Sequence, residues 1–191
     1  MIAASKNVLK QMKNTFQIIS TILKERILVL DGAMGTMIQR YKFSEEDYRG
    51  NRFKDYEYPL QGNNDLLSLT QPDAIREIHE NFLDVGADII ETNTFSSTSV
   101  AMADYHMENL IYELNFESAK IAVNACKKYT DLNPNKPRFV AGSIGPTNKT
   151  ASMSPDVNDP GFRAITFDEL VDSYSEQVEA LIEGRSRHTL G

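Results

Sequence analysis

Cysteine is almost absent from the sequence, and Cys126 is the single one. One cysteine excludes an intrachain disulfide, and such low usage is typical of proteins in a reducing compartment. No apolar run approaches the roughly 20 residues that are needed to span a bilayer, and the N-terminus lacks the continuous apolar core of a signal peptide. We therefore expect a cytoplasmic protein that does not associate with membranes.

Clustered positive charge is also lacking. The chain carries 20 Lys and Arg residues against 27 Asp and Glu residues, which gives a net charge of -7. A nucleic-acid binder needs clustered basic side chains to displace counterions from phosphates, so we expect no nucleic-acid partner. The 191 residues, of which 41% are hydrophobic and 25% charged, are typical of one soluble globular domain.

Helical and strand patterns alternate along the chain. Helices are predicted over 6–24, from Pro72 to Val85, over about 98–129, and from a capping box at Thr166 to Gly184. Three apolar runs that end in polar, glycine-containing turns predict buried strands: RILVLD (26–31), ADIIETNTF (87–95) and RFVAGSIGP (138–146). Residues 41–69 are polar, aromatic and irregular, and predict a long loop.

Two of the helices can be predicted in detail. Thr70 is expected to cap the second helix, with Pro72 in its first turn and Gly86 at its end. Its core face comprises Ile75, Ile78, Phe82 and Val85. The apolar positions of the N-terminal helix are Leu9, Met12, Phe16, Ile19 and Leu23.

Strands that alternate with long helices imply parallel βαβ units with right-handed crossovers. Such folds place their sites at the carboxyl ends of the strands. Gly32 and Gly35 have the wrong spacing for a dinucleotide-binding loop, and no P-loop is present. Periodicity leaves a partial barrel and a small open sheet as alternatives. Because a (β/α)8 barrel takes about 250 residues, any barrel here is incomplete.

Four motifs are distinctive, namely DGAMGTMIQ (31–39), GNNDLLSLTQPD (62–73), GADIIETNTF (86–95) and VAGSIGPTNKTASMSPDV (140–157). The first resembles the opening of the homocysteine S-methyltransferase family, and the other three closely resemble its cobalamin-dependent methionine synthase branch. The resemblance implies a (β/α)8 TIM barrel that binds homocysteine and transfers a methyl group from methylcobalamin to its sulfur, giving methionine. We therefore predict an α/β fold, a partial TIM barrel of about three βα units over 25–184. An N-terminal helix (1–24) precedes it and an unpatterned tail (185–191) follows.

The resemblance also suggests a substrate-binding shell at the strand ends. Asp31 is a candidate for the homocysteine ammonium, with an Asx-turn or helix N-cap as the alternative role. A carboxylate within a strand is costly unless paired, so Glu91 is either functional or part of a buried polar network. Ser143 is expected near the substrate carboxylate, with an ordinary strand-ending turn as the alternative. The remaining candidates are Gly32, Ala33, Met34 and Asn93.

The chain departs from the family in what it lacks. Family members hold zinc through cysteines on late barrel strands, and this chain has none of these, so we expect no catalytic residue, metal or cofactor and no activity by the chain alone. Zinc, cobalamin and the downstream folate, cobalamin and activation modules belong to the full-length family. His79, His106 and Cys126 are interpreted as structural residues.

Two other interpretations remain open. The chain could be a non-catalytic half-barrel that binds a partner through its open strand edges. Alternatively, it could be a small α/β barrel-like enzyme of other chemistry, for which Lys149 is a weak candidate for a Schiff-base lysine.

The cysteine count predicts that the purified chain holds no zinc tightly, because tetrahedral thiolate sites need several converging ligands and Cys126 is alone. Metal analysis after exhaustive dialysis is the measurement. A stoichiometric zinc ion that survives dialysis would contradict the prediction.

Overall fold

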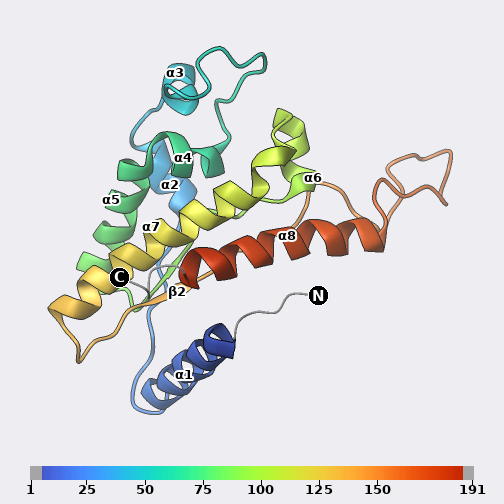
Figure 1. The fold of residues 1–191 in the computed structure, drawn as a ribbon. Coiled ribbons are helices and arrows are strands. Elements are labelled where there is room, and N and C mark those ends of the chain that lie inside the picture. Colours follow the sequence, from blue (N-terminus) through green and yellow to red (C-terminus); the bar gives the residue numbers. More distant parts are fainter. Residues whose placement is uncertain (1–5, 187–191) are drawn as a thin grey trace.

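A parallel pair of short strands lies at the centre of an α/β fold that is otherwise helical (Figure 1). The computed structural model describes residues 6–186. Strand β1 (Ile89–Glu91) pairs with β2 (Phe139–Ala141), with Ile89 opposite Phe139 and Glu91 opposite Ala141. The parallel pairing agrees with the predicted βαβ order, and both strands are shorter than predicted.

The rest of the described chain is mainly helical, and helices pack against the strand pair. In chain order they are α1 (Lys6–Ile22), α2 (Met34–Gln39), α3 (Glu45–Arg49), η1 (Asn64–Leu66), α4 (Leu67–Thr70), α5 (Pro72–Asp84), α6 (Ser99–Met102), η2 (Ala103–Tyr105), η3 (Glu108–Leu110), α7 (Ile111–Leu132) and α8 (Phe167–Ser186). No helix among the described residues is long and apolar enough to cross a membrane.

The predicted strand over 26–31 is reduced to a single parallel bridge between Leu30 and Ile89. The backbone N–H of Asp31 donates to the Ile89 carbonyl at 2.9 Å, and the next ladder bond is different: the Glu91 N–H donates to the Asp31 carboxylate, at 3.1 Å to each oxygen. A side chain therefore takes the place of the backbone where this segment leaves the sheet. Ile27 and Val29 are 84% and 54% exposed, so the predicted burial of the segment is wrong.

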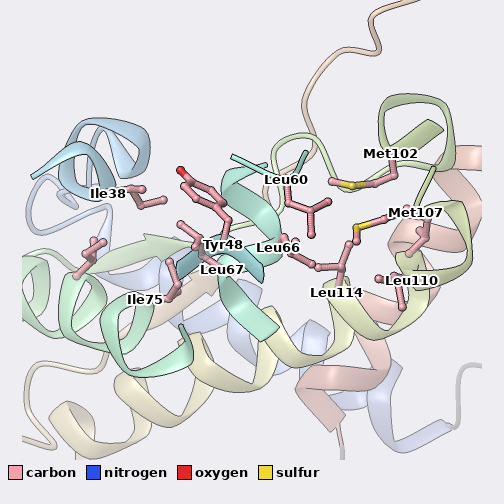
Figure 2. Packing of buried hydrophobic residues seen from close by; sticks show 12 residues of the cluster. Ile38, Tyr48, Leu60, Leu66, Leu67, Ile75, Met102, Met107, Leu110 and Leu114 are labelled. Atoms are coloured by element: carbon pink, nitrogen blue, oxygen red, sulfur yellow. The ribbon is translucent and has the colours of Figure 1, made fainter. Parts of the chain in front are cut away.

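Residues 41–69 are not the irregular loop that their composition predicts. They form α3, η1 and α4, and contribute Leu60, Leu66 and Leu67, all fully buried, to the main hydrophobic cluster (Figure 2). A capping box between Ser44 and Asp47 begins α3. Leu60 is isolated and Leu66 and Leu67 are adjacent, so these residues follow neither a helical nor a strand period, which is why the sequence pattern missed them.

Helix α5 begins at Pro72, as predicted, but its N-cap is Gln71. The Thr70 hydroxyl donates back to the Leu66 carbonyl instead of capping. Ile75 and Ile78 are fully buried, whereas Val85 is 85% exposed because it follows the last helical turn. Gly86 has a φ of +106° and turns the chain toward β1.

The helix predicted over 98–129 is interrupted. His106 has a φ of +56°, and the chain passes through η2 and η3 before α7 begins at Ile111. A left-handed residue cannot continue a right-handed helix, so the interruption follows from His106. The buried side of α7 carries small residues that allow close packing, namely Ala119, Ala122 and Ala125.

Helices α7 and α8 pack side by side (Figure 1). The predicted capping box is confirmed, because the Glu169 N–H donates to the Thr166 hydroxyl and the Glu169 carboxylate accepts from the Thr166 N–H. Gly184, however, does not end α8, which continues to Ser186. A Cβ on Gly184 would lie 2.4 Å from the Phe116 carbonyl oxygen, so this glycine allows the close approach of the two helices.

Parts of the predicted terminal segments lie outside the described residues, namely 1–5 and 187–191, together with the side chains of Leu9 and Met12. Phe16 and Leu23 of the N-terminal segment are 72% and 56% exposed. The Arg185 guanidinium donates to the Thr15 hydroxyl at 2.8 Å, which joins α1 to the end of α8.

Replacement of Gly184 by alanine is expected to destabilise the protein by about 1–3 kcal/mol through overpacking. The sign of the change in the free energy of unfolding is informative, because alanine in a helix interior normally stabilises by roughly 0.5–1 kcal/mol relative to glycine. Urea unfolding followed by circular dichroism measures the difference. Gly161→Ala is the control, since the nearest atom to its new Cβ is Asp159 Oδ1 at 3.4 Å; a Gly184→Ala variant as stable as wild type would refute the close contact.

Candidate functional site

A pocket of about 650 Å³ opens where the carboxyl ends of the strands meet the helical cover. Its walls come from Asp31 and the turn after it, the start of η1 and the segment before it, the end of β1 and the chain after it, the α6–η2 region and the chain after β2. The structure brings together in this pocket all of the predicted site residues, Asp31, Gly32, Ala33, Met34, Glu91, Asn93 and Ser143. The volume is in the range of small-molecule sites.

Asp31 and Glu91 lie together at one wall. The Asp31 carboxylate accepts the Glu91 N–H, and burial together with the nearby Glu91 charge raises the pKa of Asp31 to about 6. The N-cap of α2 is Ala33, without a side-chain cap, so Asp31 does not cap this helix. Glu91 is exposed. The alternative in which Glu91 belongs to a buried polar network is therefore wrong, because β1 ends at Glu91 and its side chain is exposed at the pocket wall.

Asn93 is buried and holds the pocket wall together. Its Nδ2 donates to the Asn64 carbonyl at 2.8 Å and to the Ser68 hydroxyl at 3.2 Å. These bonds join the end of β1 to η1 and α4. Although Asn93 lines the pocket, both of its amide protons are used within the protein.

Ser143 has both of its backbone groups engaged. Its N–H donates to the Thr92 hydroxyl at 2.9 Å, and its carbonyl accepts from the Thr94 hydroxyl at 2.8 Å. Among the described residues the Ser143 hydroxyl has no hydrogen-bond partner, and the residue lines the pocket. The side chain, rather than the backbone of this glycine-flanked turn, is therefore the group available to a ligand.

Asp65 is a pocket residue to which sequence reasoning gave no role. Its Oδ2 accepts the Ser96 N–H at 2.7 Å and the Ser97 hydroxyl at 2.8 Å. Burial is nevertheless the larger effect and raises the pKa of Asp65 to about 6. The signal was present in the GNNDLL motif, where a carboxylate directly precedes two apolar residues that are fully buried.

The charged side chains of the described chain that line the pocket are all acidic. Its lining includes Asp31, Asp65, Glu91 and Asp104, and no Lys, Arg or His of the described chain lines it. Uncompensated carboxylates attract cationic groups and repel phosphates. An ammonium-bearing ligand suits this lining, whereas a nucleotide or a phosphorylated metabolite does not.

The model of the homocysteine S-methyltransferase family matches residues 28–190. The chain belongs to this family. Its fold is similar to that of the homocysteine methyltransferase MmuM from Escherichia coli. The metallated form aligns at 23% identity with a TM-score of 0.62, over 86% of this chain and 53% of that one. The oxidized form aligns at 23% identity with a TM-score of 0.60, over 85% and 51%. The chain thus spans about half the length of these solved relatives.

A family metal does not fit the residues described here. No group of three or more His, Cys, Asp or Glu side chains among residues 6–186 could hold a metal ion. Cys126 lies on α7 and is buried, its thiol donates to the Phe139 carbonyl, and burial raises its pKa to about 12. A thiol of such high pKa is a structural residue rather than a ligand or nucleophile.

The other residues that were singled out lie outside the pocket. His79 is fully buried in α5, and burial lowers its pKa to about 4, which agrees with a structural role. His106 stacks against Tyr58, with ring centroids 3.9 Å apart. Lys149 does not line the pocket, so the structure gives the Schiff-base alternative no support.

Asp65→Asn should stabilise the protein at neutral pH. A carboxyl with a folded pKa of about 6 and an unfolded pKa near 3.8 contributes stability below pH 3.8 and loses it as the pH rises through 6. This loss amounts to roughly 3 kcal/mol, and the amide, which keeps an acceptor for Ser96, removes it. Urea unfolding of both proteins from pH 4 to 8 measures the difference.

Asp88→Asn is the matched control with the opposite sign. The hydrogen-bonded Arg26 guanidinium holds the pKa of Asp88 below its usual range, so its charge stabilises the folded state at neutral pH. We expect this variant to be less stable than wild type at pH 7. If Asp65→Asn were equally destabilising, the Asp65 charge would be a stabilising one and our description of the pocket would be wrong.

Proposed function

We propose that the pocket binds homocysteine and orients it for methylation at sulfur. The observation that supports this most directly is the pairing of Asp31 with the end of β1, in a pocket whose lining is acidic and which contains every predicted site residue. The family membership suggests the amino acid, and the charge of the lining agrees with an ammonium group. The reaction would convert homocysteine to methionine.

Each end of the substrate has a partner in this proposal. The ammonium lies against Asp31 and Glu91, whose carboxylates accept hydrogen bonds. The Ser143 hydroxyl donates to the substrate carboxylate, since the Ser143 N–H is already bonded to Thr92. Gly32, Ala33 and Met34 form the wall beside the amino acid.

Activation of sulfur needs more than these residues. A free thiol has a pKa near 8.5, so at neutral pH it is mostly protonated and weakly nucleophilic. No Lys, Arg or His of the described chain lines the pocket to stabilise a thiolate, and the carboxylates of the lining disfavour one. The described residues therefore bind and orient homocysteine, and we assign no step of sulfur activation to them.

The methyl donor is proposed from the motifs. The sequences GNNDLLSLTQPD and GSIGPTNKT resemble the cobalamin-dependent methionine synthase branch. This resemblance favours methylcobalamin as the methyl donor. On the same basis we propose that β1, β2 and the Leu30 bridge belong to a partial (β/α)8 barrel. The exposed apolar edge at Ile27, Val29 and Leu30 also supports the second candidate, a half-barrel that binds a complementary polypeptide.

Calorimetric titration with homocysteine tests the proposed function. Asp31→Asn should weaken binding about 10- to 100-fold, as expected for loss of a charged hydrogen bond. The asparagine keeps an acceptor for the Glu91 N–H, so the fold should be retained. For wild type the affinity should rise as the pH increases through 6, because Asp31 ionises there.

Asp55→Asn is the control, since Asp55 is an exposed carboxylate outside the pocket. It should bind homocysteine as wild type does. Absence of binding to the wild-type chain, or equal affinity in Asp31→Asn and wild type, would contradict the proposal.

A further inference from the structure

Both backbone polar groups of Ser143 are held by the hydroxyls of Thr92 and Thr94. These threonines are 3% and 0% exposed and follow β1, whereas Ser143 follows β2. The two hydroxyl oxygens lie 2.6 Å apart. Ser143, Thr92 and Thr94 thus form a closed ring of hydrogen bonds, which we call the threonine ring.

The proton positions in the threonine ring follow from counting donors. Each hydroxyl has one proton. The Thr94 proton goes to the Ser143 carbonyl, so the bond between the hydroxyls must use the proton of Thr92. The Thr92 oxygen is then free to accept the Ser143 N–H. Every bond runs in the same sense around the ring, an arrangement in which hydrogen bonds polarise and strengthen one another.

Gln177 of α8 adds a further link to the threonine ring. It is fully buried, and its Nε2 donates to the Thr94 carbonyl at 2.8 Å and lies 3.5 Å from the Ser143 carbonyl. The ends of β1 and β2 are therefore tied to each other and to α8. The Ser143 hydroxyl is left as the polar group of that residue without a partner in the described chain, at the pocket wall.

We propose that Thr92 and Thr94 are positioning residues, which fix the Ser143 hydroxyl for recognition of the substrate carboxylate. This inference rests on the proposed function and goes beyond it, because neither threonine hydroxyl needs to touch the ligand. The threonine ring prevents rotation of the two peptide groups that flank the Ser143 Cα. The ring thereby fixes the Ser143 Cα–Cβ direction, so only the side-chain rotations of the hydroxyl are left to be ordered on binding. This matters most in a pocket that no Lys or Arg of the described chain lines.

Matched variants separate the hydroxyl from the shape of the side chain. Thr92→Val keeps the volume and removes the hydroxyl, whereas Thr92→Ser keeps the hydroxyl. Ser143→Ala removes the donor itself. Each protein is titrated with homocysteine and with 3-aminopropane-1-thiol, which has the same thiol and ammonium but no carboxylate. Amide hydrogen exchange of Ser143 is measured without ligand.

Wild type and Thr92→Ser should bind homocysteine more tightly than 3-aminopropane-1-thiol. In Thr92→Val the preference for homocysteine over the aminothiol should fall about tenfold, because the hydrogen bond from the Ser143 hydroxyl to the ionised carboxylate is weakened. The preference should approach that of Ser143→Ala, with affinity for the aminothiol retained. Exchange at the Ser143 amide should be faster in Thr92→Val alone. A merely structural role would weaken both ligands equally.

Thr94→Val provides a second test and should give the same loss of preference. Unchanged preference in a folded Thr92→Val or Thr94→Val variant would overturn the inference, as would unchanged Ser143 exchange in Thr92→Val. Failure of both valine variants to fold would also overturn it, because the ring would then be required for the fold as a whole. If wild type binds neither ligand, the proposed function fails as well. If it binds homocysteine and the valine variants keep the preference, only the positioning role is lost.

Discussion

Backbone hydrogen-bonding groups must be satisfied where parallel strands end, and the site depends on how this chain does so. A buried N–H without a partner is costly. At the end of the Leu30 segment the Asp31 carboxylate accepts the Glu91 N–H, and at the end of β2 the Thr92 hydroxyl accepts the Ser143 N–H. In both places a side chain replaces the next carbonyl of the ladder. Polar side chains are thereby fixed at the same edge of the sheet, which is where the pocket forms.

Burial at the pocket destabilises the ionised form of two carboxylates. Asp31 and Asp65 both have pKa values raised to about 6 by burial, so at neutral pH their charges are held in surroundings that disfavour them. Asp88 shows the contrast, since Arg26 compensates its charge. Perturbed carboxylates that line a pocket are a recognised mark of functional sites. An incoming ammonium group would supply the missing compensation, which links the stability cost to ligand binding.

The placement of the candidate site residues could be predicted from the sequence better than the fold around them. Asp31, Glu91 and Ser143 lie directly after apolar runs, and the rule that parallel strands place their ends together brought them into one pocket. The rule says nothing about residues that reach the pocket from helical segments, so Asp65 was missed. The roles of Thr92 and Thr94 depend on the acceptor to which each hydroxyl donates its proton, and no sequence pattern reveals this.

Other errors have equally specific causes. His106 adopts a left-handed conformation and Gly184 fits against the Phe116 carbonyl, and both depend on tertiary contacts rather than on local propensity. Leu60, Leu66 and Leu67 were overlooked because they lack a period, although they form the centre of the main core.

The most direct test is a nitrogen-15 NMR titration of the chain with homocysteine at pH 7. If the strand ends form the amino-acid site, the amide signals of Asp31, Glu91 and Ser143 should shift together and saturate with one binding constant, while those of α1 stay unchanged. Shifts confined to other surfaces, or no saturable change at these amides, would contradict the account.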